Sequence, residues 1–270
     1  METKICKLFL QSGKDFEIAH GLTVHHPQVA EILELGNGIQ CEVIYWMYVY
    51  TLLSDPYNHM VWLDDKGIDY ESVSPFDVFI MRWIEAKEEY VKNQFQYDKM
   101  GYSPAQIFQE ALSFFLGARQ YDISTVKSGV FCICDRDAPG WCFGEDLYDL
   151  IHNFIRLINC VTDAGKIKPG TKNAKRILIE DMRDEQRRAR SKKKDNTEIS
   201  LIAESVSAFV YGGNGCITPL SFTQLHIYQL LSGAMTVNNQ MRVHAMLNGI
   251  YTGMLGTKNI SESELRWTSV

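Results

Sequence analysis

Hydrophobic residues recur at helical spacing along most of the chain, and this pattern predicts a mainly α protein. Residues 39–53 are apolar on most faces, which is typical of a helix in the centre of a core. Residues 147–158 place their large apolar side chains on one face, as expected for a helix that packs on that core. Further helices are predicted at 198–210, 221–231 and 236–254, with Ser232–Gly233 as the break between the last two.

A polar residue followed by proline marks the predicted starts of three helices. The pairs are Asp55–Pro56, Ser74–Pro75 and Ser103–Pro104. The polar side chain accepts a hydrogen bond from a free N–H group of the first turn, and proline has no N–H group to leave unsatisfied. By the same argument, Pro27 is predicted to be the first residue of a helix that ends at Gly36–Gly38.

Two regions have the pattern of short β-strands joined by turns. Near the N-terminus, Lys7–Leu10, Phe16–Ile18 and Leu22–Val24 are predicted strands. In mid-chain, residues 130–134 and 141–143 flank a turn-rich segment and are predicted to form a β-hairpin. Small β-hairpin elements are therefore expected within the mainly α fold.

Changes in composition along the chain predict three parts. Residues 1–164 are predicted to form an N-terminal α domain with short β-hairpins. Residues 165–196 are rich in basic residues and lose their apolar stripe after Met182, which predicts a basic linker or an exposed helix. Residues 197–270 are predicted to form a C-terminal helical bundle of three or four members.

The composition is that of a folded globular protein. Of the 270 residues, 46% are hydrophobic and 22% are charged, which is ordinary globular usage. The N-terminus lacks the apolar core of a signal peptide, and no apolar run reaches the roughly 18 residues of a membrane-spanning helix. Seven cysteines at irregular positions indicate reduced thiols in a cytoplasmic protein.

The net charge of −6 is divided unevenly between the two halves. Residues 1–135 hold 10 basic and 19 acidic residues, whereas residues 136–270 hold 17 and 14. An acidic N-terminal half repels phosphate groups, so any contact with nucleic acid is expected from the second half.

One basic segment is the strongest electrostatic feature, and we expect it to contact phosphates or an acidic protein surface. Its residues are Arg183, Arg187, Arg188, Arg190, Lys192, Lys193 and Lys194. A solvated helix end explains the same charges, because acidic residues interleave upstream and no aromatic side chain accompanies the run to stack on bases. Contact with nucleic acid is therefore the less favoured interpretation.

Cys132, Cys134 and Cys142 are the sharpest candidates for a metal site. Together with His152 they would supply three thiolates and an imidazole, which are the ligands of a tetrahedral zinc site. Cys132 and Cys134 alternate along a predicted strand, so both side chains lie on one face. That placement suits core residues equally well, and the chain has no Cys-x2-Cys pair. Buried free cysteines are therefore favoured over metal ligands.

The sequence contains no convincing catalytic or cofactor motif. It lacks a Gly-x-Ser-x-Gly motif, and the glycine-rich run 211–216 follows a helix instead of the strand that a phosphate-binding loop needs. The carboxylate-rich run 64–69 lacks the ligand spacing of a calcium loop and is predicted to be a solvated turn. His25 and His26 are expected on opposite sides of an extended segment, which favours capping or surface roles. A non-enzymatic protein without a cofactor is the resulting prediction.

Several stretches at both ends of the chain resemble a group of tailed-phage proteins from the structural and tail-assembly gene module. The resemblance lies in the order and pattern of residues in Leu22–Ile32, Tyr45–Trp46, Asp55–Leu63, Gly67–Tyr70, Val73–Phe79, Ile217–Pro219, Leu225–Leu230 and Leu265–Trp267. It carries no catalytic residues that could be transferred to this chain.

The resemblance implies a phage assembly protein, similar to the tail assembly chaperones that hold tail or tape-measure subunits before polymerisation. Such a protein acts through protein–protein contacts in the host cytoplasm. Two alternatives stay open. One is a structural component of the virion, such as a connector or tail protein, and the other is an accessory protein that contacts nucleic acid through the basic segment.

Overall fold

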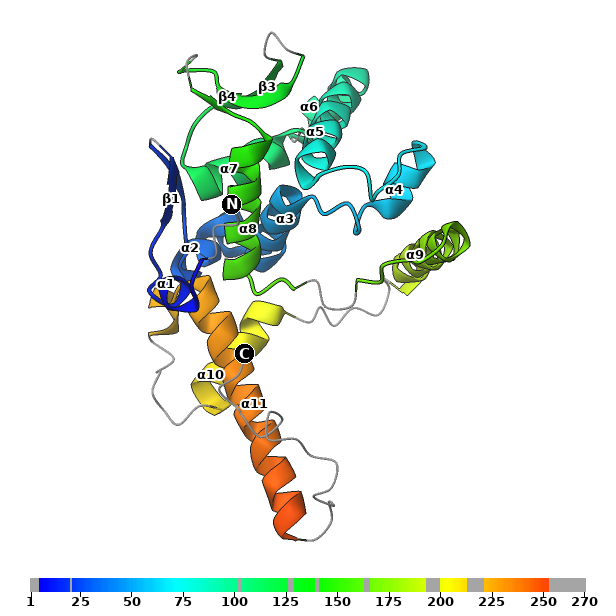
Figure 1. Cartoon of the computed structure of the whole chain (residues 1–270). Coiled ribbons are helices and arrows are strands. Elements are labelled where there is room, and N and C mark those ends of the chain that lie inside the picture. Colours follow the sequence, from blue (N-terminus) through cyan, green and yellow to red (C-terminus); the bar gives the residue numbers. More distant parts are fainter. Residues whose placement is uncertain are drawn as a thin grey trace.

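The computed structural model describes residues 5–19, 21–101, 103–125, 129–138, 141–162, 166–192, 200–212 and 221–252. Within these ranges the chain is mainly helical and has two small antiparallel sheets, as predicted (Figure 1). The helices are α1 (Lys7–Gln11), α2 (Val29–Glu34), α3 (Cys41–Leu53), α4 (Met60–Asp65), α5 (Pro75–Lys92), α6 (Gln94–Met100), α7 (Gln106–Leu116), α8 (Glu145–Ile158), α9 (Lys172–Lys192), α10 (Leu201–Gly212) and α11 (Ile227–Tyr251), with 3-10 turns at Leu35–Gly38 and Phe222–Gln224. The strands are β1 (Phe16–Ala19), β2 (Leu22–Val24), β3 (Tyr121–Thr125), β4 (Phe131–Asp135) and β5 (Cys142–Phe143). No helix in these ranges is long and apolar enough to cross a membrane.

Helix α3 lies at the centre of the main core. Tyr45, Val49 and Leu52 lie along one face at helical spacing, and none of them has any exposed surface. Helices α5, α7 and α8 pack against α3. The hydroxyl of Tyr45 donates a 2.7 Å hydrogen bond to Oδ1 of Asn159, which pairs two buried polar groups. The prediction of a central helix at 39–53 is therefore confirmed for this face of α3.

The predicted helix start at Ser74–Pro75 is confirmed as the beginning of α5. The backbone N–H of Asp77 donates to Oγ of Ser74 over 3.1 Å. In return, the carboxylate of Asp77 accepts from the backbone N–H of Ser74 over 3.0 Å. This reciprocal pair satisfies N–H groups that the first turn of a helix leaves free.

The other two polar–proline pairs precede turns, and their helices begin later than predicted. After Asp55–Pro56, the backbone N–H of Tyr57 donates to the carboxylate of Asp55, and α4 starts only at Met60. After Ser103–Pro104, α7 starts at Gln106 without a side-chain cap. The side chain of Asp55 and the backbone carbonyl of Ser103 each accept a hydrogen bond within a turn that precedes the helix.

The N-terminal region differs from prediction because it contacts α11. Lys7–Leu10, predicted as a strand, belongs to α1, and Gln11 at the end of α1 donates to Oγ of Ser232 over 3.0 Å. Pro27 precedes α2 instead of beginning it, and its carbonyl accepts from the N–H of Ile227. These long-range contacts outweigh the local preferences of short segments. The other two predicted strands are confirmed as β1 and β2, which pair with each other.

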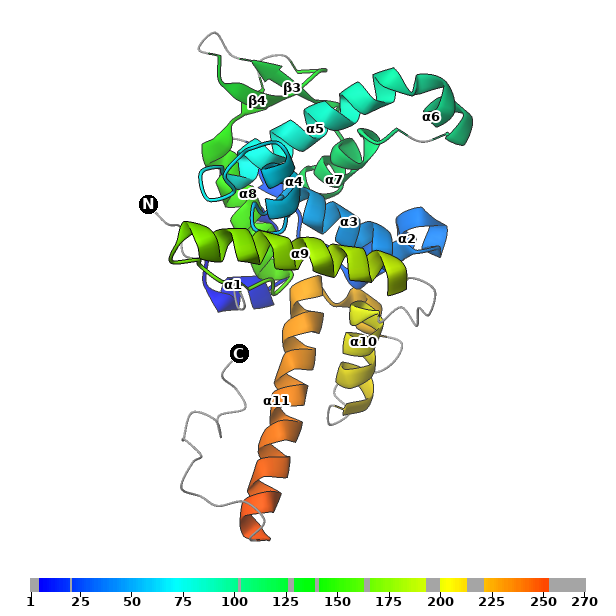
Figure 2. The ribbon, with the colours of Figure 1, turned by 90° about the vertical axis from the view of Figure 1, so that its right-hand side faces the viewer.

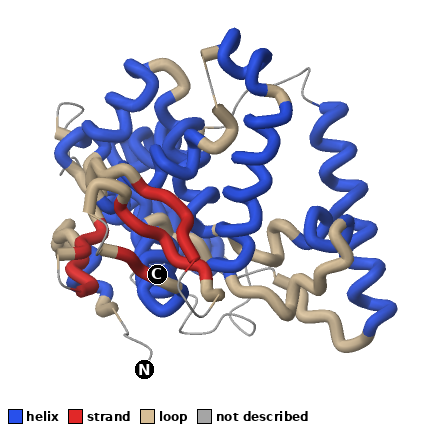
Figure 3. The backbone as a smooth tube through the Cα atoms, turned by 90° about the horizontal axis from the view of Figure 1, so that it is seen from above, coloured by secondary structure: helices blue, strands red, loops and turns tan. Residues whose placement is uncertain are grey.

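The predicted mid-chain hairpin is confirmed as β4 and β5, and the sequence missed a third strand. Strand β3 pairs with β4 in antiparallel register from Tyr121 opposite Asp135 to Thr125 opposite Phe131. Tyr121, Ile123 and Thr125 alternate with polar residues in β3, which is a strand pattern that the sequence reasoning overlooked. In the view from above, the strands lie in the left half of the molecule (Figure 3).

The C-terminal region contains one long helix where two were predicted. Ser232–Gly233 does not end a helix but lies within α11, and the described part of this region is a pair, α10 and α11, instead of a larger bundle (Figure 2). A Cβ atom at position 233 would lie 2.7 Å from the ring of Phe209 in α10. Glycine is therefore present because the two helices approach closely, and not because the helix ends.

Helix α9 lies against α4 and contributes to a second, smaller core (Figures 1 and 2). Ile179 is buried, and Leu178 and Met182 are partly buried beside it. The segment predicted as a linker or exposed helix therefore includes a docked helix. After Met182, the side chains of Arg187 and Arg188 are exposed.

Candidate functional site

One face of α3 carries large apolar side chains that no described element covers. Val43, Met47 and Tyr50 follow one another at helical spacing and are 42%, 45% and 52% exposed. The sequence predicts a helix surrounded by the core, and for this face that prediction is wrong. Because a helix that is apolar on most faces is ordinarily buried, an exposed apolar stripe on α3 indicates a binding surface.

These side chains line a groove of about 1090 Å³. Trp46 of α3, Ile107 of α7 and Leu201 of α10 also line the groove. Apolar residues from three helices therefore surround a cavity that is large enough for side chains of a partner.

Arg82 of α5 supplies a positive charge to this groove. Its Nη1 donates to Nε2 of His59 over 3.2 Å. Burial and the charge of Arg82 lower the pKa of His59 to about 4, so this imidazole is neutral at pH 7. Among the described residues no carboxylate lies within ion-pair distance of Arg82, and the nearby carboxylate of Glu85 accepts hydrogen bonds from Lys66 and Trp62. A guanidinium in this setting is suited to an anionic group of a ligand.

The other wall of the groove is held in place by Glu42. Its carboxylate accepts from the backbone N–H of Ile202 over 2.8 Å and from the indole of Trp46 over 3.2 Å. The start of α10 and the Trp46 ring are thereby fixed relative to α3, so the groove is formed before a ligand binds. The sequence reasoning missed the groove, although an apolar run on all faces of 39–53 was a signal for it.

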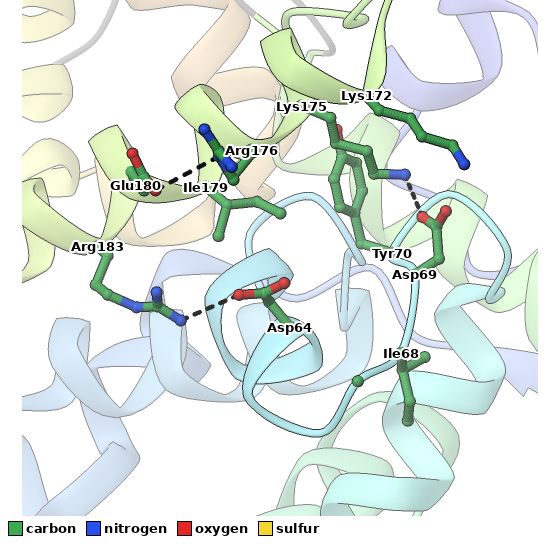
Figure 4. A pocket seen from close by; sticks show the side chains of 11 residues that line it. Asp64, Ile68, Asp69, Tyr70, Lys172, Lys175, Arg176, Ile179, Glu180 and Arg183 are labelled. Atoms are coloured by element: carbon green, nitrogen blue, oxygen red, sulfur yellow. Dashed lines mark hydrogen bonds and ion pairs between the residues drawn. The ribbon is translucent and has the colours of Figure 1, made fainter.

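The basic residue Arg183 faces α4 and is neutralised there (Figure 4). Its Nη2 lies 3.2 Å from Asp64 and 2.5 Å from Asp65. Nearby, Lys175 is paired with Asp69 and lies 4.5 Å from the centre of the Tyr70 ring. The run 64–69 was predicted to be a solvated turn, and its carboxylates are exposed as expected. The prediction did not include the end of α4, which takes in Asp64 and Asp65, or the ion pairs with α9.

A pocket of about 470 Å³ lies between α9 and the loop after α4 (Figure 4). Its basic side chains include Lys175 and Arg183, whose charges are balanced by the carboxylates around them. The hydrogen bond from Lys175 lowers the pKa of Asp69, as expected for a stable ion pair. The ion pairs of Lys175 and Arg183 in this pocket therefore hold α9 in place.

The other predicted contact residues lie beyond Arg183 on α9 or after it. Arg187 is exposed and lies 3.2 Å from Asp184, and Arg188 is exposed as well. Arg190 and Lys192 belong to α9, whereas Lys193 and Lys194 lie outside the described residues. The structure thus separates Arg183, which faces α4, from the exposed part of the basic segment.

The structure brings together three of the four predicted zinc ligands. The Sγ atoms of Cys132, Cys134 and Cys142 all lie within 4.8 Å of one another. Cys132 is buried, whereas Cys142 is exposed. His152 of α8 does not belong to this group, and the described ranges contain no fourth ligand for it.

The two adjacent histidines point to opposite sides, as predicted, but only one has a surface role. His25 lies 3.0 Å from Asp15 and 2.9 Å from Glu31. His26 has no exposed surface, so the prediction of a capping or surface role is wrong for it. Its ring packs against the rings of Phe154 and His226, which are distant in sequence.

Comparisons of the chain with known protein families, with curated proteins and with solved structures find no match. The resemblance to tailed-phage proteins therefore stays a prediction. The groove over α3 is the site that the geometry favours most.

Proposed function

We propose that this chain is a non-enzymatic phage assembly protein that binds an amphipathic segment of another phage protein in the groove over α3. The observation that carries the proposal is the uncovered apolar face at Val43, Met47 and Tyr50. Burying such side chains against a partner contributes about 1 kcal/mol or more for each of them. Together these side chains favour contact with a partner.

The chemistry of the groove defines the partner segment. Apolar side chains at helical spacing fit the stripe on α3, as in other helix-in-groove contacts. A carboxylate at one end of the segment fits Arg82, which has no acidic partner among the described residues. We therefore expect an amphipathic helix with an acidic residue or a C-terminal carboxylate at one end.

The resemblance to tailed-phage proteins directs the choice of partner to tail and tape-measure subunits. A chaperone for such subunits acts in the host cytoplasm and leaves before the particle is complete. Mass spectrometry of purified virions distinguishes this role from that of a connector or tail protein. A chaperone is expected to be missing from the particles, and its presence there in stoichiometric amounts would favour the structural role.

The direct test uses two valines with different surroundings. Val43 lies in the groove, whereas Val91 of α5 is 73% exposed and does not line the groove. Each is replaced by aspartate, and binding to tail and tape-measure subunits from the same genome is measured by titration. V43D is expected to weaken binding by at least about tenfold, which corresponds to about 1.4 kcal/mol. V91D is expected to bind like the wild type.

Two results would overturn the proposal. One is that no tail or tape-measure subunit of the same genome binds the wild-type protein. The other is that V43D binds as tightly as V91D while both fold normally.

A second candidate function is contact with nucleic acid through the end of α9. The observation that favours it is the exposure of Arg187 and Arg188, whereas Arg183, one turn earlier on the same helix, is held by α4. Neutralising Arg187, Arg188, Lys192, Lys193 and Lys194 is expected to abolish a salt-sensitive gel shift. R183Q is the control and is expected to retain the shift. No shift by the wild type at low salt would exclude this function.

A further inference from the structure

The three-stranded sheet presents three thiols on one face. Cys132 and Cys134 are alternate residues of β4, so their side chains leave the same face of the strand. Cys142 of β5 is the cross-strand partner of Cys134, and such partners share a face. The sulfurs of Cys132 and Cys134 are 3.5 Å apart, and that of Cys142 is within 4.8 Å of both. Strand pairing thus assembles a cluster from two separate strands.

We propose that Cys132, Cys134 and Cys142 form a binding site for a soft, thiophilic metal cation. Thiolate ligands select monovalent copper and zinc over hard cations such as magnesium or calcium. A metal about 2.3 Å from each sulfur holds tetrahedral ligands about 3.8 Å apart. The sulfurs already lie near this separation, so binding requires only small side-chain rotations.

The ligand count defines how each metal would bind. Three thiolates complete a trigonal site for monovalent copper. Zinc prefers four ligands and would take a water molecule as the fourth, because no histidine or carboxylate of the described residues joins the cluster. Cys142 is exposed, so the cation has a route from solvent to the sulfurs.

A group of charged side chains lies on the strand that pairs with β4 and around it. Asp122 of β3 is the cross-strand partner of Cys134. Its carboxylate is paired with both Lys87 and Arg136, so this trio has a net positive charge. Three thiolates around a monovalent or divalent cation carry a charge of −2 or −1, and this trio does not oppose that charge with a net negative charge of its own.

Metal binding at this site releases protons. The ligand of a metal is the thiolate, whereas a free cysteine thiol is ordinarily protonated at neutral pH. Each metal–sulfur bond replaces one S–H bond, and up to three protons pass to solvent for each cation. The cation keeps its oxidation state, so no oxidant or reductant takes part. The affinity is therefore expected to rise with pH.

The test compares two exposed cysteines. Cys142 belongs to the cluster, whereas Cys6 is exposed and lies outside it. The full chain is reduced, freed of reductant under anaerobic conditions, and titrated separately with zinc and with monovalent copper against a chromophoric chelator. We expect one cation per chain and a rise in Tm on binding. C142S is expected to lower the affinity by at least about tenfold, whereas C6S is expected to match the wild type.

The proposal is overturned if neither metal competes with the chelator for the wild-type protein, or if C142S binds as tightly as C6S. Far-UV circular dichroism of both variants establishes that they fold like the wild type. The cluster lies on the sheet and shares no residue with the groove over α3. A negative result here would therefore leave the proposed binding function unaffected.

Discussion

Acid is expected to destabilise this protein through His26. The side chain has no exposed surface, and neither ring nitrogen has a hydrogen-bond partner among the described residues. Its ring centre lies 5.9 Å from that of Phe154 and 4.9 Å from that of His226. Burial, and next the charge of His226, lower the pKa of His26 from 6.5 to about 4. Protonation of this side chain is therefore disfavoured in the folded state.

The size of the effect follows from the two pKa values. Above about pH 6.5, His26 is neutral in both states and contributes no pH dependence. Between about pH 6.5 and pH 4, the unfolded chain binds a proton that the folded chain does not bind, so the free energy of unfolding falls as the pH falls. Each pH unit in this window costs about 1.4 kcal/mol. A change from pH 6.5 to pH 5 therefore costs about 2 kcal/mol.

The substitution H26L removes this titration while keeping a side chain of similar volume. Urea unfolding is followed by tryptophan fluorescence at about pH 7.5 and at about pH 5. The wild type is expected to lose about 2 kcal/mol more than H26L between these conditions. His59, whose pKa is also lowered to about 4, is present in both proteins and cancels in the comparison.

His244 supplies the control because it is exposed on α11. H244L is expected to show the same pH dependence as the wild type. The reasoning is refuted if H26L and the wild type lose equal stability between the two pH values.

Three further substitutions test packing and capping, each by urea unfolding at neutral pH. G233A places a methyl group against the ring of Phe209, and the strain is expected to outweigh the roughly 1 kcal/mol that alanine gains in helix propensity. The expected net loss of stability is about 1–3 kcal/mol. An unchanged or higher stability would contradict the close approach of α10 and α11. S74A removes a side-chain cap and is expected to cost about 1 kcal/mol, whereas S103A, whose side chain does not cap α7, is expected to cost much less. Y45F leaves a buried amide without its donor and is expected to cost about 1–3 kcal/mol, and no loss would show that this hydrogen bond is dispensable.

The candidate sites could be predicted from the sequence only in part. The alternation of Cys132 and Cys134 indicated a shared face, and Cys142 was correctly placed in the adjoining strand. The register that puts Cys142 opposite Cys134 depends on strand pairing, which residue types alone do not specify. The groove over α3 was missed, because a sequence shows that a helix is apolar but not which of its faces the other helices cover.

The sequence by itself determined the features that depend on neighbours a few residues away. The mainly helical class, the helices at 39–53 and 147–158, the mid-chain hairpin and the Ser74–Pro75 start all follow from local spacing and capping. Only the tertiary structure decided the features that depend on distant partners. Lys7–Leu10 is helical where α1 meets α11, α11 continues through Gly233 because Phe209 lies beside it, and the carboxylates of 64–69 bind α9. Such contacts join residues far apart in the chain, and their energies outweigh local propensities that amount to less than about 1 kcal/mol per residue.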